Sequence, residues 1–463
     1  MSEDVILKEQ LVIYKNQGRF AKIEGGLSVY YEFFPAPAIF WEFEVFNKDD
    51  AALEIKTGNA TGELAYPFEG HQLIIPKPWS GSPRGDNSPR RSIGFIRHGN
   101  APMVFLGKKD LLGKTFNFWL PNAKFQYYGM FHNFVVKDVS HRAPNSPGGL
   151  VLGYDGSVRE GFMQTTIAGK IKLSLHTPVE AINWLKSSSS TGTYLTTAGT
   201  IEVDAAISIV EAADLLNYIS HLLSFANGGF IGPLIVEMTP TSFEKDYPTQ
   251  YTAYAIDSIE RIGGSWLGPE SSTTTLLECL PTYQKMIKTP YWGRDFELIL
   301  IWYFQALQPQ GLQIRGKPWP ITANALGAVL EKLASIILVE EMGIISESDF
   351  KKRNFRFEDK IRRLLKAIGI RDVGPKYETG NPINGSKDSV WWFVEMRNDA
   401  THSRSNRTWT ESEVSVISEN AMQWVEEVLL WRLGYRGKYL DRSRKSWVSI
   451  DPRYDLSLRD PSW

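Results

Sequence analysis

Apolar and polar positions follow two different patterns along this chain. Over the first 200 residues the apolar side chains come in short runs or alternate with polar ones. Alternation with period two, and short apolar runs bounded by Gly, Pro or charge, are typical of β-strands. Such segments lie at residues 40–46, 72–75, 93–96 and 103–106. They predict a β-rich N-terminal region, with breaker-rich loops at residues 77–91 and 143–149.

Helical spacing first appears near residue 208. A set of apolar residues recurs there every three or four positions, which predicts a helix over residues 208–226. Its members are Ile209, Ala212, Ala213, Leu216, Ile219, Leu222 and Leu223. Asn227-Gly228-Gly229 ends the pattern, as expected of residues that tolerate a left-handed C-cap. A strand is predicted next, at residues 232–238.

From about residue 290 the pattern is helical. Helices are predicted at residues 296–307, from Thr322 onward and at residues 357–368. Ser386 is the predicted cap of a fourth helix, and Thr410 and Glu413 form the capping box of a fifth. We therefore predict an α+β multidomain chain, with a β-rich region at residues 1–285 and an all-α bundle of four to five helices at residues 286–463.

Composition narrows the class of protein. The 463 residues are 43% hydrophobic and 22% charged, as in soluble globular proteins. The single cysteine, Cys279, excludes an internal disulfide and fits a reducing compartment. The chain begins Met-Ser-Glu-Asp, without the basic start of a signal peptide, and contains no apolar run of about 20 residues. These features predict a cytoplasmic protein that does not span a membrane.

The overall charge argues against a protein that coats nucleic acid. The net charge is −1, divided into +3 from residue 291 onward and −4 before it. A nucleic-acid site would therefore have to be a local basic patch.

The segment Arg397-Asn398-Asp399-Ala400-Thr401-His402 carries the most specific chemistry. A histidine can move a ribose 2′-hydroxyl proton at neutral pH, and a guanidinium can hold charge on a phosphate. Five residues of an ideal helix set the Arg397 and His402 side chains about 140° apart. Because Asn and Asp compete for backbone hydrogen bonds, we expect a break at Asn398 and Asp399 that lets the two converge. The competing interpretation makes Arg397 a partner of the helix dipole and His402 a surface residue.

A helical bundle late in the chain with Arg-Asn-x-x-x-His at a helix end resembles the HEPN superfamily (higher eukaryotes and prokaryotes nucleotide-binding domains). The resemblance covers roughly residues 290–435. The β-rich region followed by a helix ending in residues 222–228 is similar to ApeA-type bacterial proteins, which join such a region to a HEPN ribonuclease in anti-phage defence. The expected fold of residues 286–463 is therefore a HEPN bundle.

The resemblance implies a metal-independent endoribonuclease without cofactors, acting on RNA such as tRNA. His402 would be the general base or acid, Arg397 would stabilise the phosphate, and Asn398 would orient one of them. Glu331 is a further candidate, on a polar stripe that also suits a solvated helix face. The family further implies a homodimer in which two motifs share one cleft, and a phage-derived trigger acting on the N-terminal region.

A basic segment precedes the motif helix, and its phosphate contacts would position RNA without reading sequence. An ordinary solvated face explains the same charges. The candidate RNA-binding residues are Lys351, Lys352, Arg353, Arg356, Arg362, Arg363, Arg404 and Arg407.

Other motifs predict no site. Residues 107–115 resemble a phosphate-binding loop, but five residues separate the glycines and a strand follows, so we interpret them as a hairpin turn. The histidines at 71, 98, 132 and 141 lack paired ligand spacing, and no metal site is predicted. The alternative function is a non-catalytic HEPN protein that binds a nucleotide, a nucleic acid or a phage protein.

Overall fold

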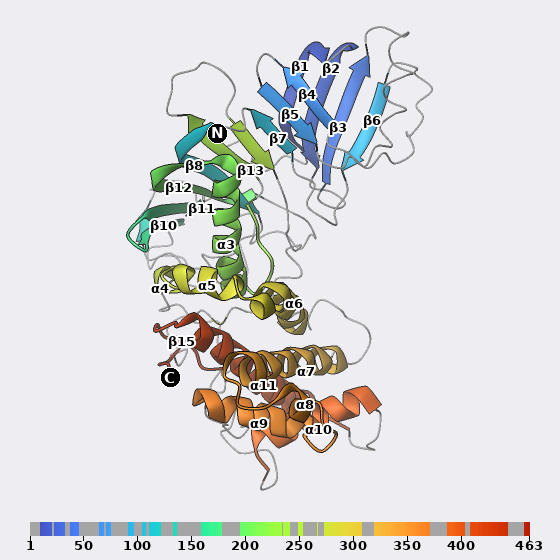
Figure 1. The fold of residues 1–463 in the computed structure, drawn as a ribbon, viewed down its shortest axis with the longest axis vertical. Coiled ribbons are helices and arrows are strands. Elements are labelled where there is room, and N and C mark those ends of the chain that lie inside the picture. The colour runs from blue at the N-terminus through green and yellow to red at the C-terminus, as the bar shows by residue number, and fades with distance from the viewer. Residues whose placement is uncertain are drawn as a thin grey trace, which may run out of the picture.

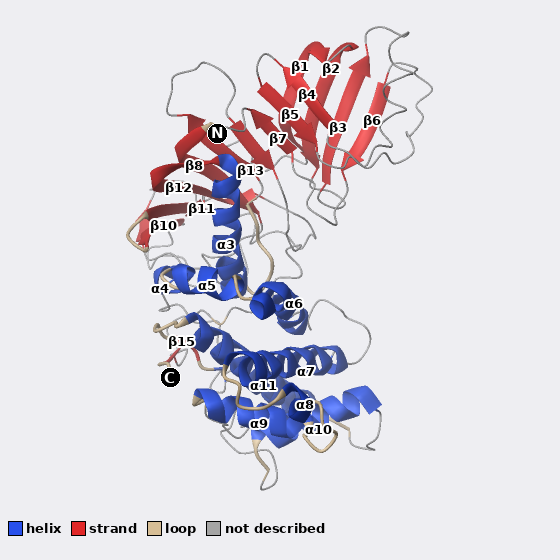
Figure 2. Cartoon of the chain, in the orientation of Figure 1, coloured by secondary structure: helices blue, strands red, loops and turns tan. Residues whose placement is uncertain are grey.

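The computed structural model describes side chains for residues 111–121, 164–176, 197–233, 236–238, 266, 275–307, 319–370, 387–402, 408–442 and 459–463. Elsewhere it describes only the backbone of strands and helix ends. Most strands lie in the N-terminal part, together with helix α3, and most helices lie in the C-terminal part, together with a short strand pair (Figures 1 and 2). The chain is thus a mixed α+β protein, as the hydrophobic patterns predict.

The described strands form two antiparallel sheets before residue 253. The smaller has the order β1-β2-β3-β6 and the larger the order β4-β5-β7-β14-β13-β8-β12-β11-β10-β9. Their bounds are β1 (Gln10–Phe20), β2 (Ile23–Glu32), β3 (Ala38–Val45), β4 (Leu64–Phe68), β5 (His71–Ile75), β6 (Arg91–Ile96), β7 (Val104–Gly107), β8 (Leu112–Pro121), β9 (Asn133–Val136), β10 (Arg159–Ile167), β11 (Ile171–Thr177), β12 (Leu195–Ser208), β13 (Ile235–Pro240) and β14 (Thr249–Thr252). The predicted strands at residues 40–46, 72–75, 93–96, 103–106 and 232–238 all overlap one of these.

Helix α3 (Ile209–Asn227) follows β12 directly and packs on the larger sheet against β8, β12, β13 and β14. A capping box begins it: the Ser208 side chain accepts from the Glu211 N–H, and the Glu211 carboxylate accepts from the Ser208 N–H at 2.8 Å. Gly228 ends it with a left-handed backbone, φ 77°. Both ends of the predicted helix are therefore confirmed.

The C-terminal helices pack mainly on α7, which contacts α6, α9, α10 and α11. A π-helical segment, η5, continues α7. The bounds are α4 (Thr273–Leu277), α5 (Leu280–Ile287), α6 (Pro290–Leu307), α7 (Trp319–Ser335), η5 (Ile336–Glu341), α8 (Glu347–Phe350), α9 (Phe357–Ile368), α10 (Ser389–His402) and α11 (Glu411–Leu433), followed by the short strands β15 (Tyr439–Leu440) and β16 (Leu458–Arg459). The five predicted helices correspond to α6, α7, α9, α10 and α11.

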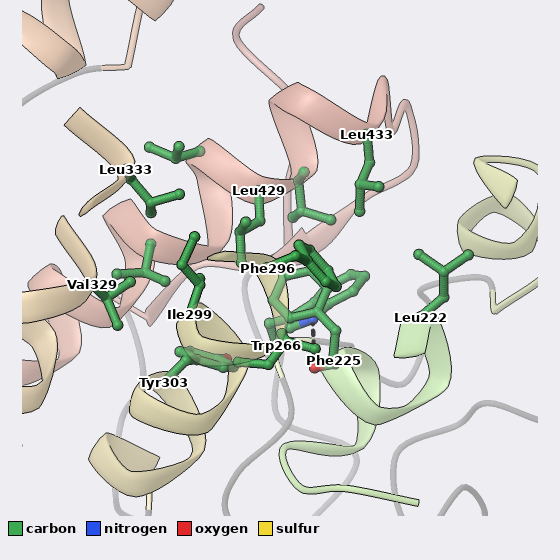
Figure 3. Close-up of a cluster of buried hydrophobic side chains, with 14 of the residues drawn as sticks. Leu222, Phe225, Trp266, Phe296, Ile299, Tyr303, Val329, Leu333, Leu429 and Leu433 are labelled. Carbon is green, nitrogen blue, oxygen red and sulfur yellow. Dashed lines mark hydrogen bonds between the residues drawn. The ribbon is translucent and has the colours of Figure 1, made fainter. Parts of the chain in front are cut away.

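One hydrophobic core runs from α3 into the helical part (Figure 3). The Trp266 indole donates to the Phe225 carbonyl of α3 at 3.0 Å, and the two rings lie 5.2 Å apart. His221 Nδ1 of α3 lies 2.6 Å from the Tyr283 hydroxyl of α5. Because α5 (Leu280–Ile287) itself crosses residue 285, the predicted domain boundary falls inside continuous packing and is not marked by a gap.

Two local predictions need correction. Residues 107–115 are not a hairpin turn, because β7 and β8 are separated in the sheet by β14 and β13. The described cap of α10 is Asp388, whose carboxylate accepts from the Trp391 N–H at 2.9 Å. The predicted cap, Ser386, and the predicted loop at residues 143–149 lie outside the described residues, as does the predicted loop at residues 77–91 except for Arg91, which begins β6.

Among the described residues, one segment is long and apolar enough to span a membrane by length and composition alone. It is residues 319–341, which comprise α7 and η5, and 67% of its most apolar window is buried inside the protein. Its Leu326, Leu330, Leu333 and Ile337 are fully buried. This segment is accordingly the central core helix of the bundle.

Candidate functional site

The Arg-Asn-x-x-x-His segment forms the last turns of α10, which remains helical to His402. The expected break at Asn398 and Asp399 is therefore wrong. Their polar side chains make tertiary or neighbouring contacts in place of competing for the helix backbone. The Asp399 carboxylate accepts from the Trp409 indole N–H at 2.9 Å, and Asn398 Oδ1 lies 3.4 Å from a guanidinium nitrogen of Arg397. Arg397 and His402 thus leave one continuous helix about 140° apart.

Arg397 is a half-buried cation held against two neighbouring helices. Its guanidinium lies over the Phe357 ring of α9, 5.0 Å from the ring centroid. Its aliphatic stem lies against Gly327 of α7, where an added Cβ would stand only 3.2 Å from the Arg397 Cγ. Gly327 therefore allows the close approach of α10 to α7. An arginine with its stem packed and its planar head stacked has lost much of its rotamer freedom before any ligand arrives.

The last turn of α10 is tied to α7 by Thr401. The Thr401 hydroxyl lies 2.8 Å from Asn324 Oδ1 and 2.9 Å from the Arg397 carbonyl. Asn324 stands one turn before Gly327, so Thr401 and Arg397 dock on the same face of α7. Together with the bond from Trp409 to Asp399, this contact fixes the helix end that carries the motif.

His402 is exposed at the end of α10, and Asn398, one turn earlier, is half-buried. Residues four apart on a helix are surface neighbours, so Asn398 lies between Arg397 and His402 on the helix surface. The site in one chain is therefore a half-buried cation, an amide that contacts it and an exposed imidazole, and the cation and the imidazole do not point to a common position.

Glu331, the additional candidate, lies on α7 one turn after Gly327. Its carboxylate is paired with Lys360 of α9, with 2.5 Å between Oε1 and Nζ. The Lys360 ammonium also lies 4.3 Å from the centroid of the Phe350 ring. Asn324, Gly327 and Glu331 thus form one stripe of α7 facing α9 and α10. The structure thus places Glu331 at the same junction of helices as Arg397, and the Glu331 carboxylate is already paired with Lys360.

Six of the predicted RNA-binding cations are described by the structure, and three of these have a carboxylate partner. Lys351 pairs with Glu347 at 2.5 Å and Lys352 with Asp349 at 2.5 Å. These are exposed pairs, which contribute little to stability.

Arg362 is engaged more strongly than the two lysines. It bridges Glu358 and Asp388, with 2.6 Å between its NH1 atom and Asp388 Oδ2. Hydrogen bonds to the two carboxylates raise the pKa of Arg362, and the Arg362 guanidinium in turn lowers the pKa of Asp388. Arg362 therefore joins α9 to the start of α10, and its contact with RNA stays a prediction.

The remaining predicted cations divide into two groups. Arg353, Arg356 and Arg363 are exposed, and no carboxylate of the described residues pairs with them. Arg404 and Arg407 lie outside the described residues. The exposed basic surface near the motif therefore rests on α9 and the turn before it.

Metal ligation receives no support from the described side chains, among which no group of three or more His, Cys, Asp or Glu could hold a metal ion. Cys279 is buried, and burial raises the pKa of its thiol to about 12. It is therefore an inert core residue.

Three residues of this site are not predicted from the sequence. They are Gly327, Phe357 and Trp409, which hold α10 in place, whereas Asn324 belongs to the polar stripe predicted with Glu331. A glycine inside a strongly apolar helix pattern was the available signal, since it costs helix stability unless another backbone or side chain approaches.

Comparison with known proteins locates one family resemblance. The model of the YopA C-terminal domain family matches residues 289–451, roughly a third of the chain. The match begins one residue before α6 and includes every helix that contributes to the Arg397 site. No curated protein and no solved structure matches the chain.

Proposed function

We propose that this chain is a cytoplasmic, metal-independent endoribonuclease of a bacterial anti-phage system, with a HEPN-type catalytic bundle in residues 286–463. The observation that supports this proposal best is that the Arg397 side chain is held in one orientation by its neighbours. A guanidinium stacked on Phe357 and seated over Gly327 is oriented in advance for a phosphate, as electrostatic stabilisation of a transition state requires. An exposed His402 at the same helix end can reach a substrate.

The chemistry needs a base and an acid. One group removes the 2′-hydroxyl proton as that oxygen bonds to the adjacent phosphorus. Another protonates the 5′-oxygen as the phosphorus–oxygen bond breaks, leaving a 2′,3′-cyclic phosphate and a 5′-hydroxyl. Arg397 would hold the charge on the phosphoryl oxygens, with Asn398 orienting it and Glu331 limiting the mobility of the surrounding cations.

One chain supplies a single histidine at this helix end. Because Arg397 and His402 leave the continuous helix α10 about 140° apart, the imidazole and the guanidinium of one chain do not point to the same position. A homodimer that apposes two α10 ends would supply a second histidine and allow His402 of one protomer to face Arg397 of its partner. The β-rich region would hold this cleft at weak basal activity until a phage-derived trigger binds it.

The test is cleavage of total cellular RNA in EDTA by the full chain, comparing wild type with His402→Ala and mapping the new ends. We expect cyclic-phosphate ends with wild type alone. His402 is exposed, so its replacement should change the free energy of unfolding by no more than about 0.5 kcal/mol. Equal cleavage by wild type and the variant would remove the proposal. Because the untriggered nuclease is expected to have only weak basal activity, wild type and His402→Ala are also compared for phage protection in cells.

A second candidate is a HEPN protein that binds a nucleotide, a nucleic acid or a phage protein without catalysis. The divergence of Arg397 and His402 along one helix favours it, because a binding surface needs no convergence. Phage protection that survives His402→Ala but fails with Arg397→Ala would select this function.

A further inference from the structure

Helix α9 presents three different surfaces around its axis. Its apolar face is buried in the bundle through Ile361, Leu364, Leu365 and Ile368. The two borders of that face are closed by ion pairs, Lys360 with Glu331 on one side and Arg362 with Asp388 on the other. What remains between the borders is an outward stripe formed by Arg356, Arg363 and Lys366.

Two of these cations lie on one side of the helix, and the third stands at its start. Arg363 and Lys366 are three residues apart and fall within about 60° of each other at 100° per residue, and Arg356 is the N-cap residue, with an extended backbone. All three are exposed, and no carboxylate of the described residues is paired with them. Asp359 also lies in the stripe, and its carboxylate accepts from the Arg356 backbone N–H at 3.0 Å. The stripe therefore keeps a net charge of +2, on a helix whose other cations are neutralised by partners.

The stripe begins beside the residue that Arg397 contacts. Arg356 immediately precedes Phe357, the residue on which the Arg397 guanidinium lies. Arg362, in the middle of α9, binds Asp388 at the start of α10. From Arg356 to Lys366 the stripe spans ten residues, or about 15 Å, leading away from Arg397.

We propose that Arg356, Arg363 and Lys366 bind the phosphates of an RNA strand that extends from Arg397 along the outer face of α9. This inference rests on the proposed function, since it takes Arg397 to mark the position of a substrate phosphate. Arginines and a lysine in a row contact phosphates without reading bases, so the stripe positions RNA of any sequence. Arg353, in the turn before α9, lies at the end nearest the motif.

The experiment measures RNA binding by the full chain as a function of salt. His402→Ala is the background, so that the RNA stays intact, and the probe is a fluorescent single-stranded oligoribonucleotide of mixed sequence. The stripe variant carries Arg356→Gln, Arg363→Gln and Lys366→Gln. The charge-matched control carries Lys170→Gln, Lys285→Gln and Lys288→Gln, three exposed lysines away from α9.

Each lost phosphate contact should reduce the slope of log K against log salt by about 0.7 for a single strand. We therefore expect the stripe variant to lose about two units of slope and the control to keep the slope of the background protein. Equal slopes in the two variants, or no RNA binding by the background protein, would overturn the proposal. RNA that binds along the stripe but is never cut by the wild type would leave it standing while removing the nuclease function.

Discussion

Arg397 and Phe357 form the contact that orients the motif, with the guanidinium carbon 5.0 Å from the ring centroid. The ring belongs to α9 and the cation to α10, so the interaction joins the helix bearing the exposed basic stripe to the helix bearing His402. A stacked guanidinium keeps its N–H groups in the plane and available for a phosphate. The contact therefore contributes to packing and, under the proposed function, would also orient the guanidinium for chemistry.

Arg397→Lys should separate charge from geometry. Lysine keeps the positive charge but loses the planar fork and the stacking surface. We expect cleavage to fall at least about 100-fold, as when one donor to a transition-state oxyanion is removed. Thermal unfolding should change little, because the aliphatic stem still covers Gly327. Cleavage rates and melting temperatures of the two proteins provide the test, and a fully active Arg397→Lys protein would show that charge alone suffices.

Gly327→Ala should stabilise helix α7 and reduce RNA cleavage. Alanine in a helix interior is favoured over glycine by about 1 kcal/mol. The new Cβ, however, would stand 3.2 Å from the Arg397 Cγ and 3.4 Å from its Nε, so the arginine must move. We expect the free energy of unfolding to be unchanged or slightly higher and the rate of RNA cleavage to be lower. Parallel denaturation and cleavage measurements decide it; unaltered cleavage would mean that the position of Arg397 is not critical.

Thr401→Val tests whether the end of α10 must be fixed. Valine preserves the shape of threonine but removes the hydroxyl that lies 2.8 Å from Asn324 Oδ1. Losing one such bond should cost about 1 kcal/mol of unfolding free energy. We expect a lower kcat with KM nearly constant, because His402, one residue later, becomes less well placed. Thr401→Ser retains the hydroxyl and is the matched control, so equal kcat values for the valine and serine proteins would contradict this role.

Much of the fold could be predicted from hydrophobic spacing. The helices α3 and α11 can be predicted because each combines apolar residues at helical spacing with a local boundary signal, Gly228 after α3 and the Thr410 capping box before α11. The order of strands in the sheet could not be predicted. Pairing of β7 with β14, and not with β8, depends on contacts between residues about 145 positions apart, which no local pattern encodes.

The candidate site was only partly predictable for the same reason. Arg397 and His402 were found by residue type and spacing, which are local. The continuity of α10 was missed because Asp399 has a partner, Trp409, that local propensity does not include. Likewise, the basic segment could not be divided into paired and unpaired cations, since Asp388, which binds Arg362, lies 26 residues away. Both partners, Trp409 and Asp388, reach these side chains only through the tertiary packing of the helices.

A buried carboxyl beneath the C-terminal strands gives the protein a predicted pH dependence. Glu427 Oε1 accepts from the Tyr439 hydroxyl at 2.8 Å and lies 3.1 Å from an Arg459 guanidinium nitrogen. Its other oxygen is buried, with no hydrogen-bond partner among the described residues. Burial raises the pKa of Glu427 from 4.5 to about 7, against the opposing effect of Arg459. Near neutral pH this carboxyl is therefore partly protonated.

Glu427→Gln should remove that dependence. A carboxyl whose pKa is higher in the folded state stabilises the fold fully below its unfolded pKa, and the stabilisation is lost as pH rises through the folded value. Between pH 4.5 and about 8 the wild type should thus lose on the order of 3 kcal/mol from this group, whereas glutamine loses none. Urea unfolding of both proteins at several pH values measures the difference. We expect the free energy of unfolding of the variant to rise steadily relative to that of the wild type as pH rises, with equal m-values. A difference in unfolding free energy that stays constant with pH would mean that Glu427 remains ionised in the folded protein, paired with Arg459.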